Sequence, residues 1–134
     1  TAARLQQNLA QVEGQVADAC RRAGRQRSEV RLVAVTKYVA AARAQQLVDL
    51  GVVDLGESRP QELWNKAAAV TGPVRWHLVG HLQRNKVQRT LPLVELIHSV
   101  DSTRLLDALP ATAAAQRRVA RVLAEVHLSG EASK

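Results

Sequence analysis

Residues 30–37 read VRLVAVTK, and this stretch decides the fold. Its apolar part, Val30–Val35, is short and rich in β-branched residues, which predicts a strand that is buried on both faces. An amphipathic helix is predicted before it, over residues 3–23, because apolar residues recur there at helical spacing. A second helix is predicted after it, over residues 40–50, with Gly51 as its C-terminal stop. The stretch is therefore the strand of a strand–helix unit.

The same alternation continues to the end of the chain. Apolar runs predict four more strands, and amphipathic segments predict the helices between them. The strands are predicted at Val52–Leu55, Val74–Val79, Leu96–Val100 and Val119–Leu128, and the helices at Pro60–Val70, residues 83–90 and residues 103–116. Such regular alternation is typical of βαβ units with a parallel sheet. Because no linker or low-complexity tract interrupts it, residues 1–134 are predicted to form a single α/β domain.

Composition narrows the classes of function. The 134 residues are 46% hydrophobic and 23% charged, as in an ordinary globular domain. The net charge of +7 suits an anionic ligand, and also nucleic acid. However, aromatic residues make up only 2% of the chain, and proteins that bind single strands need aromatic side chains on which bases stack. An RNA-binding module is therefore a minor hypothesis, for which salt-dependent binding would be the test.

Membrane and secretory signals are not seen in the sequence. No window approaches the ~18 uninterrupted apolar residues of a membrane span, and the polar N-terminal segment does not resemble a secretory signal. Cys20 is the only cysteine, which excludes a disulfide within the chain and a cysteine metal site. A reducing compartment, and hence the cytoplasm, is expected.

Each predicted strand ends in a polar cluster. These clusters are residues 36–38, 56–59, 80–83, 101–102 and 129–131. In parallel α/β folds, and above all in barrels, the ligand site is built from the carboxyl ends of the strands. The pattern therefore predicts that the ligand site lies on this edge of the sheet, but it does not indicate which ligand binds there.

Lys37 is the most informative residue on that edge. It follows a strand predicted to be buried, so it is expected to be partly desolvated, which favours the neutral and nucleophilic amine. Such an amine forms Schiff bases with carbonyl compounds, including pyridoxal phosphate. Position alone favours the other interpretation, a solvated lysine that closes the strand. Tyr38 is expected to point elsewhere, because side chains alternate along a strand.

Other strand-end residues allow two interpretations. Glu57, Ser58 and Arg59 could orient a ligand or could cap the helix that begins near Pro60. His77 could be a ligand or a hydrogen-bonded core residue. The compact motifs GxGxxG, GxxxxGK[ST], HExxH and GxSxG are all missing, which disfavours the enzyme classes that carry them, and no metal site is indicated.

Taken together, the strand ends resemble one family. The motifs are LVAVTK (32–37), GESRPQE (56–62), WHLVGHLQRNK (76–86), IHSVDS (97–102) and SGEASK (129–134). In order and spacing they are similar to the pyridoxal phosphate homeostasis proteins, and the block 76–86 is the most specific. The resemblance implies a (β/α)8 TIM barrel like the N-terminal domain of alanine racemase, of which this chain covers roughly the first five strands.

The resemblance also implies a ligand and a role. Pyridoxal 5'-phosphate would be held as a Schiff base on Lys37, with Ser58, His77 and Gly80 as further candidate cofactor-binding residues. Ser58 stands where the family usually has asparagine. The implied role is vitamin B6 homeostasis without established catalysis; the alternative is an amino-acid racemase-like enzyme that depends on the same cofactor.

Chain length bears on the assembly. A (β/α)-barrel typically takes about 250 residues, so this chain is expected to be part of a longer polypeptide, or else a half-barrel that pairs with another copy. A monomer is expected for the full-length family fold, and self-association is left open for a half-barrel.

Overall fold

The sheet is parallel and has five strands in the order β1-β2-β3-β4-β5, in a computed structural model that describes residues 1–130. The strands are β1 (Ala34–Val35), β2 (Asp54–Glu57), β3 (Arg75–Leu78), β4 (Val94–Val100) and β5 (Val122–Ala124). Each strand pairs with the next along the chain, as consecutive strands of βαβ units commonly do. The predicted α/β class and parallel sheet are therefore confirmed.

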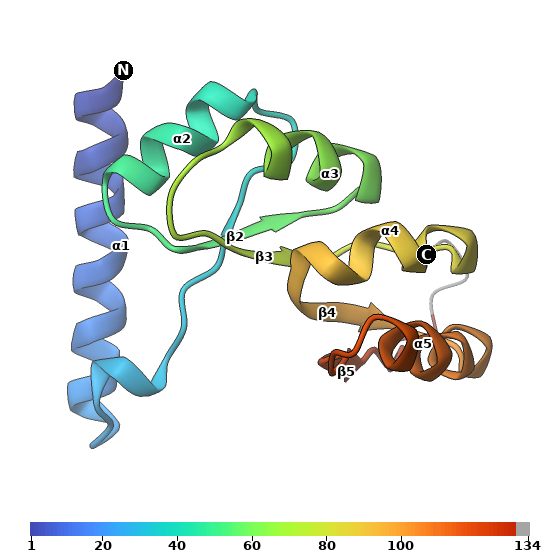
Figure 1. Cartoon of the computed structure of the whole chain (residues 1–134). Coiled ribbons are helices and arrows are strands. Elements are labelled where there is room, and N and C mark those ends of the chain that lie inside the picture. The colour runs from blue at the N-terminus through green and yellow to red at the C-terminus, as the bar shows by residue number, and fades with distance from the viewer. Residues whose placement is uncertain (131–134) are drawn as a thin grey trace.

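Helices connect the strands and cover one face of the sheet, while the long first helix precedes β1 and stands to one side (Figure 1). The α-helices are α1 (Ala2–Arg22), α2 (Ala41–Asp49), α3 (Pro60–Ala69), α4 (Val87–Thr90) and α5 (Thr103–Ala115), and the 3-10 helices are η1 (Arg27–Glu29), η2 (Arg84–Lys86) and η3 (Leu91–Leu93). Ser102 caps the helix α5, since its hydroxyl accepts a hydrogen bond from the Leu105 amide at 3.2 Å. No helix within residues 1–130 is both long and apolar enough to cross a membrane.

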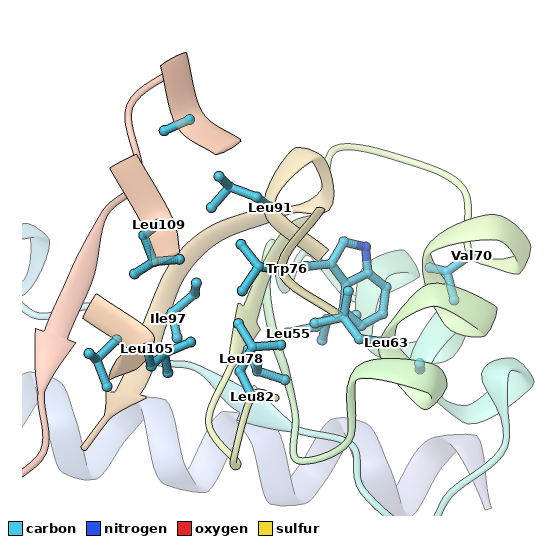
Figure 2. Packing of buried hydrophobic residues seen from close by; sticks show 14 of the residues in the cluster. Leu55, Leu63, Val70, Trp76, Leu78, Leu82, Leu91, Ile97, Leu105 and Leu109 are labelled. Atoms are coloured by element: carbon cyan, nitrogen blue, oxygen red, sulfur yellow. The ribbon is translucent and has the colours of Figure 1, made fainter. Parts of the chain in front are cut away.

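The core lies between the sheet and these helices (Figure 2). Leu55, Trp76, Leu78 and Ile97 are buried on the helix-facing side of β2, β3 and β4, where they pack with helix residues such as Leu63. Because side chains alternate along a strand, their neighbours in sequence point to the opposite face. That second face carries Val35, His77, His98 and Leu123, and its outermost members, Val35 and Leu123, are about half exposed.

Four predicted elements differ from the structure. The second strand is predicted over Val52–Leu55 but lies two residues further on, at Asp54–Glu57. The first strand is predicted over Val30–Val35 but forms ladder bonds only at Ala34 and Val35, because it lies at an edge of the sheet and pairs with β2 alone. The last is predicted over Val119–Leu128 but is limited to β5, the other edge. The segment 83–90 is η2 followed by α4 and not one helix. Closure into a barrel is not seen in residues 1–130, whose sheet is open at β1 and β5.

Candidate functional site

The carboxyl ends of the strands meet at one edge of the sheet, and a cavity lies there beside Lys37. It has a volume of about 280 Å³. The residues that line it come from the turn after β1, from the end of β2 and from the start of α3 with the two residues before it: Lys37, Tyr38, Val39, Glu57, Ser58, Arg59 and Glu62. The structure thus brings together two of the polar clusters that the sequence predicts to be close.

Lys37 itself is more open to solvent than predicted. Its side chain is exposed, so the expected partial desolvation is wrong for the described residues. The reason is the edge position of β1, since only β2 and the turn after it border the amine on that side. Within residues 1–130 no hydrogen bond or ion pair to an acidic group engages the Lys37 ammonium, whose Nζ lies 5.7 Å from the centroid of the Tyr38 ring.

Lys37 occupies a tight turn. The Val39 amide donates a hydrogen bond to the Thr36 carbonyl at 3.3 Å, which closes a four-residue turn with Lys37 and Tyr38 at its centre. Tyr38 has a φ of 67°, a conformation that non-glycine residues rarely adopt. This φ ends the extended backbone, so strand alternation does not apply. Tyr38 consequently lines the same cavity as Lys37, and the prediction that it points elsewhere is wrong.

A buried polar cluster lies directly behind this turn. Glu57 is 1% exposed and Lys66, from α3, is 4% exposed. The Thr36 hydroxyl donates to Glu57 Oε1 at 2.7 Å, and the Lys66 ammonium forms an ion pair with the same oxygen. Lys66 Nζ also donates to the Thr36 carbonyl at 2.7 Å. The cluster therefore connects β1, β2 and α3 at the residue that precedes Lys37.

Ser58 and Gly80 lie at adjacent strand ends, as the register of β2 and β3 requires. A Cβ added to Gly80 would lie 1.9 Å from the Ser58 carbonyl oxygen, so only glycine fits there. The Ser99 hydroxyl donates a hydrogen bond to the Gly80 carbonyl and ties β4 to the same place. Ser58 borders the Lys37 cavity; Gly80 does not line it but determines how closely β3 approaches.

His77 lies deeper, within β3. Its side chain is fully buried, with Nε2 at 2.9 Å from Asp54 Oδ1 and Nδ1 at 2.9 Å from His98 Nε2. This agrees with the interpretation of His77 as a hydrogen-bonded core residue. It does not line the Lys37 cavity, and its contact with a cofactor stays a prediction.

Asp54 and His98, the two ends of the hydrogen-bonded series Asp54–His77–His98, have shifted pKa values. Burial alone would raise the pKa of Asp54, but the hydrogen bonds from Arg75 and His77 and the charges of Arg75 and Arg31 outweigh it, so the pKa is lowered. Burial, together with the nearby His77, lowers the pKa of His98. The chain Asp54–His77–His98 therefore favours an ionised carboxylate and a neutral His98.

A larger cavity, of about 550 Å³, lies at the opposite, amino end of β2 and β3. Its arginines are engaged by acids: Arg75 contacts Asp54 through two hydrogen bonds at 2.8 and 2.9 Å, and Arg27 contacts Glu13 at 2.7 Å. These pairs link η1 to α1 and β3 to β2. We interpret this cavity as a structural ion-pair region.

The structure corrects one interpretation of the residues at this edge and adds residues that were not predicted. Arg59 is the N-cap of α3, and no side chain makes a hydrogen bond at that cap, so the capping interpretation of residues 57–59 is wrong. Lys66 and Asp54 are not predicted as site or network residues. The signal for Lys66 is its position three residues after Leu63, on the buried face of α3.

No protein-family model matches the chain, but curated relatives do. It is 33% identical over 131 residues to the pyridoxal phosphate homeostasis protein of Pseudomonas aeruginosa, a match that covers 97% of this chain and 57% of the relative. It is 36% identical over 143 residues to the protein of the same name in Mycobacterium tuberculosis, covering 94% and 55%. The chain thus spans a little over half the length of the curated relatives.

Solved structures support the same family. An unknown protein from Bifidobacterium adolescentis superposes with a TM-score of 0.87 at 34% identity, covering 99% of this chain and 58% of that one. PipY of Synechococcus elongatus, solved with pyridoxal phosphate bound, gives a TM-score of 0.75 at 33% identity, covering 87% and 57%. Over the part that it shares with these proteins, the chain belongs to the pyridoxal phosphate homeostasis protein family.

Proposed function

We propose that this chain provides the lysine side of a pyridoxal phosphate site and acts in intracellular homeostasis of that cofactor. One observation carries the proposal: Lys37 lies at the carboxyl edge of the sheet, on a cavity that it shares with the end of β2. The names of the relatives and the cofactor bound in the PipY structure support the same ligand. Buffering of the cofactor, without catalytic turnover, is the function that we propose for it.

The chemistry needs only a neutral amine and an aldehyde. Pyridoxal phosphate would supply the aldehyde, and Lys37 would be the residue that holds it, through condensation of its amine with release of water. The residues present fit this role. The Lys37 amine is accessible, and the cavity beside it also has the Arg59 guanidinium and the Ser58 hydroxyl, which suit an anionic and polar ligand. Two carboxylates line it as well: Glu57 is paired with Lys66, and Glu62 lies at the start of α3.

We further propose that the five strands are the first part of a (β/α)8 barrel in a longer polypeptide. The share of the relatives that the chain matches supports this, as do its two open sheet edges. Within such a barrel, His77 would face the interior below Lys37, because it lies on the sheet face opposite the helices. We also propose a cytoplasmic location, which the lone thiol of Cys20, without a disulfide partner, supports.

The test is a titration of pyridoxal phosphate into the natural polypeptide that carries this sequence. Reduction with borohydride, followed by peptide mass mapping, should place the cofactor on Lys37. The variant Lys37→Ala should lose both the visible absorbance of the Schiff base and the reduced adduct. Lys86→Ala should keep both, because no hydrogen bond or ion pair involves the Lys86 side chain within residues 1–130.

An adduct on another lysine, or an unchanged spectrum in Lys37→Ala, would contradict the proposal. Racemisation of an amino acid by the same sample would favour the racemase-like alternative. That reaction needs a second acid or base facing Lys37 across the cofactor. Tyr38 lies next to Lys37 in the same turn and therefore on the same side.

A further inference from the structure

We propose that Lys66 is a positioning residue, whose buried ammonium holds the turn that presents Lys37. The inference deepens the proposed function and rests on it for the role of Lys37. The observation is a direct hydrogen bond: Lys66 Nζ donates to the carbonyl of Thr36, the residue before Lys37, at 2.7 Å. Lys66 lies 30 positions further along the chain, on α3, so a separate element holds the turn in place.

The turn needs such a support. Its own closing hydrogen bond, from the Val39 amide to Thr36 O, is long at 3.3 Å, and Tyr38 is held at a φ of 67°. A tyrosine in this conformation persists only where the surroundings fix it. Lys66 donates a second, charge-assisted hydrogen bond to the same carbonyl oxygen, and such bonds are stronger than neutral ones.

Burial of the Lys66 ammonium is itself unusual and has no simple packing explanation. Lysine is rarely buried unless it is paired, and an apolar side chain at this position of α3 would pack beside Leu63 without a desolvation penalty. The ammonium is compensated by Glu57, which also accepts the hydrogen bond of the Thr36 hydroxyl. Both the carbonyl and the hydroxyl of Thr36 are thus held by one ion pair that spans β2 and α3.

A Schiff base at Lys37 depends on where this turn places the amine. An amine and an aldehyde react only when they are held close and correctly oriented, so the orientation of the Lys37 peptide contributes directly to affinity. Lys66 does not line the cavity and is almost fully buried. It therefore acts through the Thr36 peptide and does not touch the ligand.

The experiment compares variants of the natural polypeptide that carries this sequence. Lys66→Met removes the ammonium and keeps the length of the side chain. Glu57→Gln combined with Lys66→Met removes both charges, so no unpaired carboxylate stays buried and the fold is preserved. Lys86→Met is the matched control, a lysine in η2 with its side chain outside the hydrogen bonds and ion pairs of residues 1–130.

The first readout needs no cofactor. Amide hydrogen exchange at Val39 reports the turn, and it should become at least about tenfold faster in the double variant while exchange in β3 and β4 stays unchanged. Exchange at Val39 that equals that of the unmodified protein would overturn the proposal. This result is independent of ligand binding, so it stands apart from the failure of the proposed function, which would appear as no adduct on Lys37 in the unmodified protein.

The second readout is pyridoxal phosphate affinity, measured through the borohydride-reduced adduct on Lys37. Loss of one charged hydrogen bond should weaken it by about tenfold or more in the double variant and leave Lys86→Met unchanged. Glu57 itself lines the cavity, so Glu57→Gln alone is the reference for the double variant. Restored stability with affinity weaker than in Glu57→Gln is the signature of positioning by Lys66. Affinity in a folded double variant equal to that in Glu57→Gln would overturn it, because the ion pair would then serve stability alone.

Discussion

Gly80 is a residue at which the absence of a side chain determines the approach of two strand ends. A methyl group there would lie 1.9 Å from the Ser58 carbonyl, so the backbones of β2 and β3 would have to separate. We expect Gly80→Ala to lower the free energy of unfolding by about 1–3 kcal/mol, as overpacking does. Urea denaturation measures this.

Gly14 provides the matched control for that substitution. It lies within α1, and a Cβ there would meet nothing within 4 Å. Gly14→Ala should therefore raise the free energy of unfolding by up to about 1 kcal/mol, the difference in helix propensity. Equal effects of the two substitutions would show that the contact at Ser58 has no energetic consequence.

The ion pair of Lys66 and Glu57 gives a second expectation at the scale of single residues. Lys66→Met leaves a buried carboxylate without its cation, which should cost about 3–5 kcal/mol of stability. Glu57→Gln added to it removes that charge, and most of the loss should be recovered. A double-mutant cycle by thermal or urea unfolding measures the coupling between the two positions.

The sequence made Lys37 a candidate and the family resemblance assigned it, whereas neither predicted Lys66. Lys37 is recognisable because a polar cluster follows a buried strand, a local pattern in the sequence. Lys66 is not, because a lysine in an amphipathic helix is normally solvated. Its burial depends on Glu57 in β2 and Thr36 after β1, which only the folded chain brings together. The exposure of Lys37 was not predicted either, because it depends on the position of β1 at the edge of the sheet, which the local sequence does not determine.

At the scale of elements, the chain Asp54–His77–His98 links β2, β3 and β4 through their side chains. The pKa of His98 is lowered below 6.5 by burial and by His77, so the unfolded chain binds the proton more tightly than the folded one. Stability from this group is fully present above pH 6.5 and is lost as the pH falls through the lowered pKa. Thermal unfolding between pH 7 and pH 5 should show this loss.

His98→Gln should flatten that part of the stability profile, because glutamine does not titrate. His81→Gln is the control at an exposed histidine near Asp101, and it should leave the slope between these pH values in place. A slope that survives in His98→Gln but vanishes in His81→Gln would show that the buried chain is not the source of the pH dependence.

The order and type of the elements were predictable, but the edges of the sheet were not. Alternating apolar runs and amphipathic segments reflect local periodicity, so five parallel strands and the helices between them follow from the sequence. The length of β1 and β5 depends on hydrogen bonds to a neighbour, and each has such a neighbour on one side only. Apolar residues such as Val30 and Leu128 therefore lie outside the ladder.

At the scale of the whole molecule, the open edges and the helix-free face of the sheet determine whether residues 1–134 associate with one another when no longer polypeptide is present. Val35 and Leu123 on that face are 47% and 49% exposed, next to unpaired strand edges. Exposed apolar edges promote association. We expect the apparent mass of this segment in sedimentation velocity to rise with concentration, and Leu123→Lys to reduce the rise.

The substitution Arg104→Lys, at an exposed position on α5, should leave the rise unchanged and serves as the control. A mass that stays that of a single copy at all concentrations would contradict the expectation. The longer polypeptide proposed above would bury the same face within itself, so its mass should not depend on concentration.

The shared hydrogen-bonding of Glu57 and Lys66 also has an evolutionary consequence. A change at either position alone passes through an unneutralised charge in the protein interior, whereas a simultaneous change at both does not. Descendants of this sequence are therefore expected to keep both residues or to exchange them together, and drift at these two sites should be correlated even though 9 positions separate them along the chain.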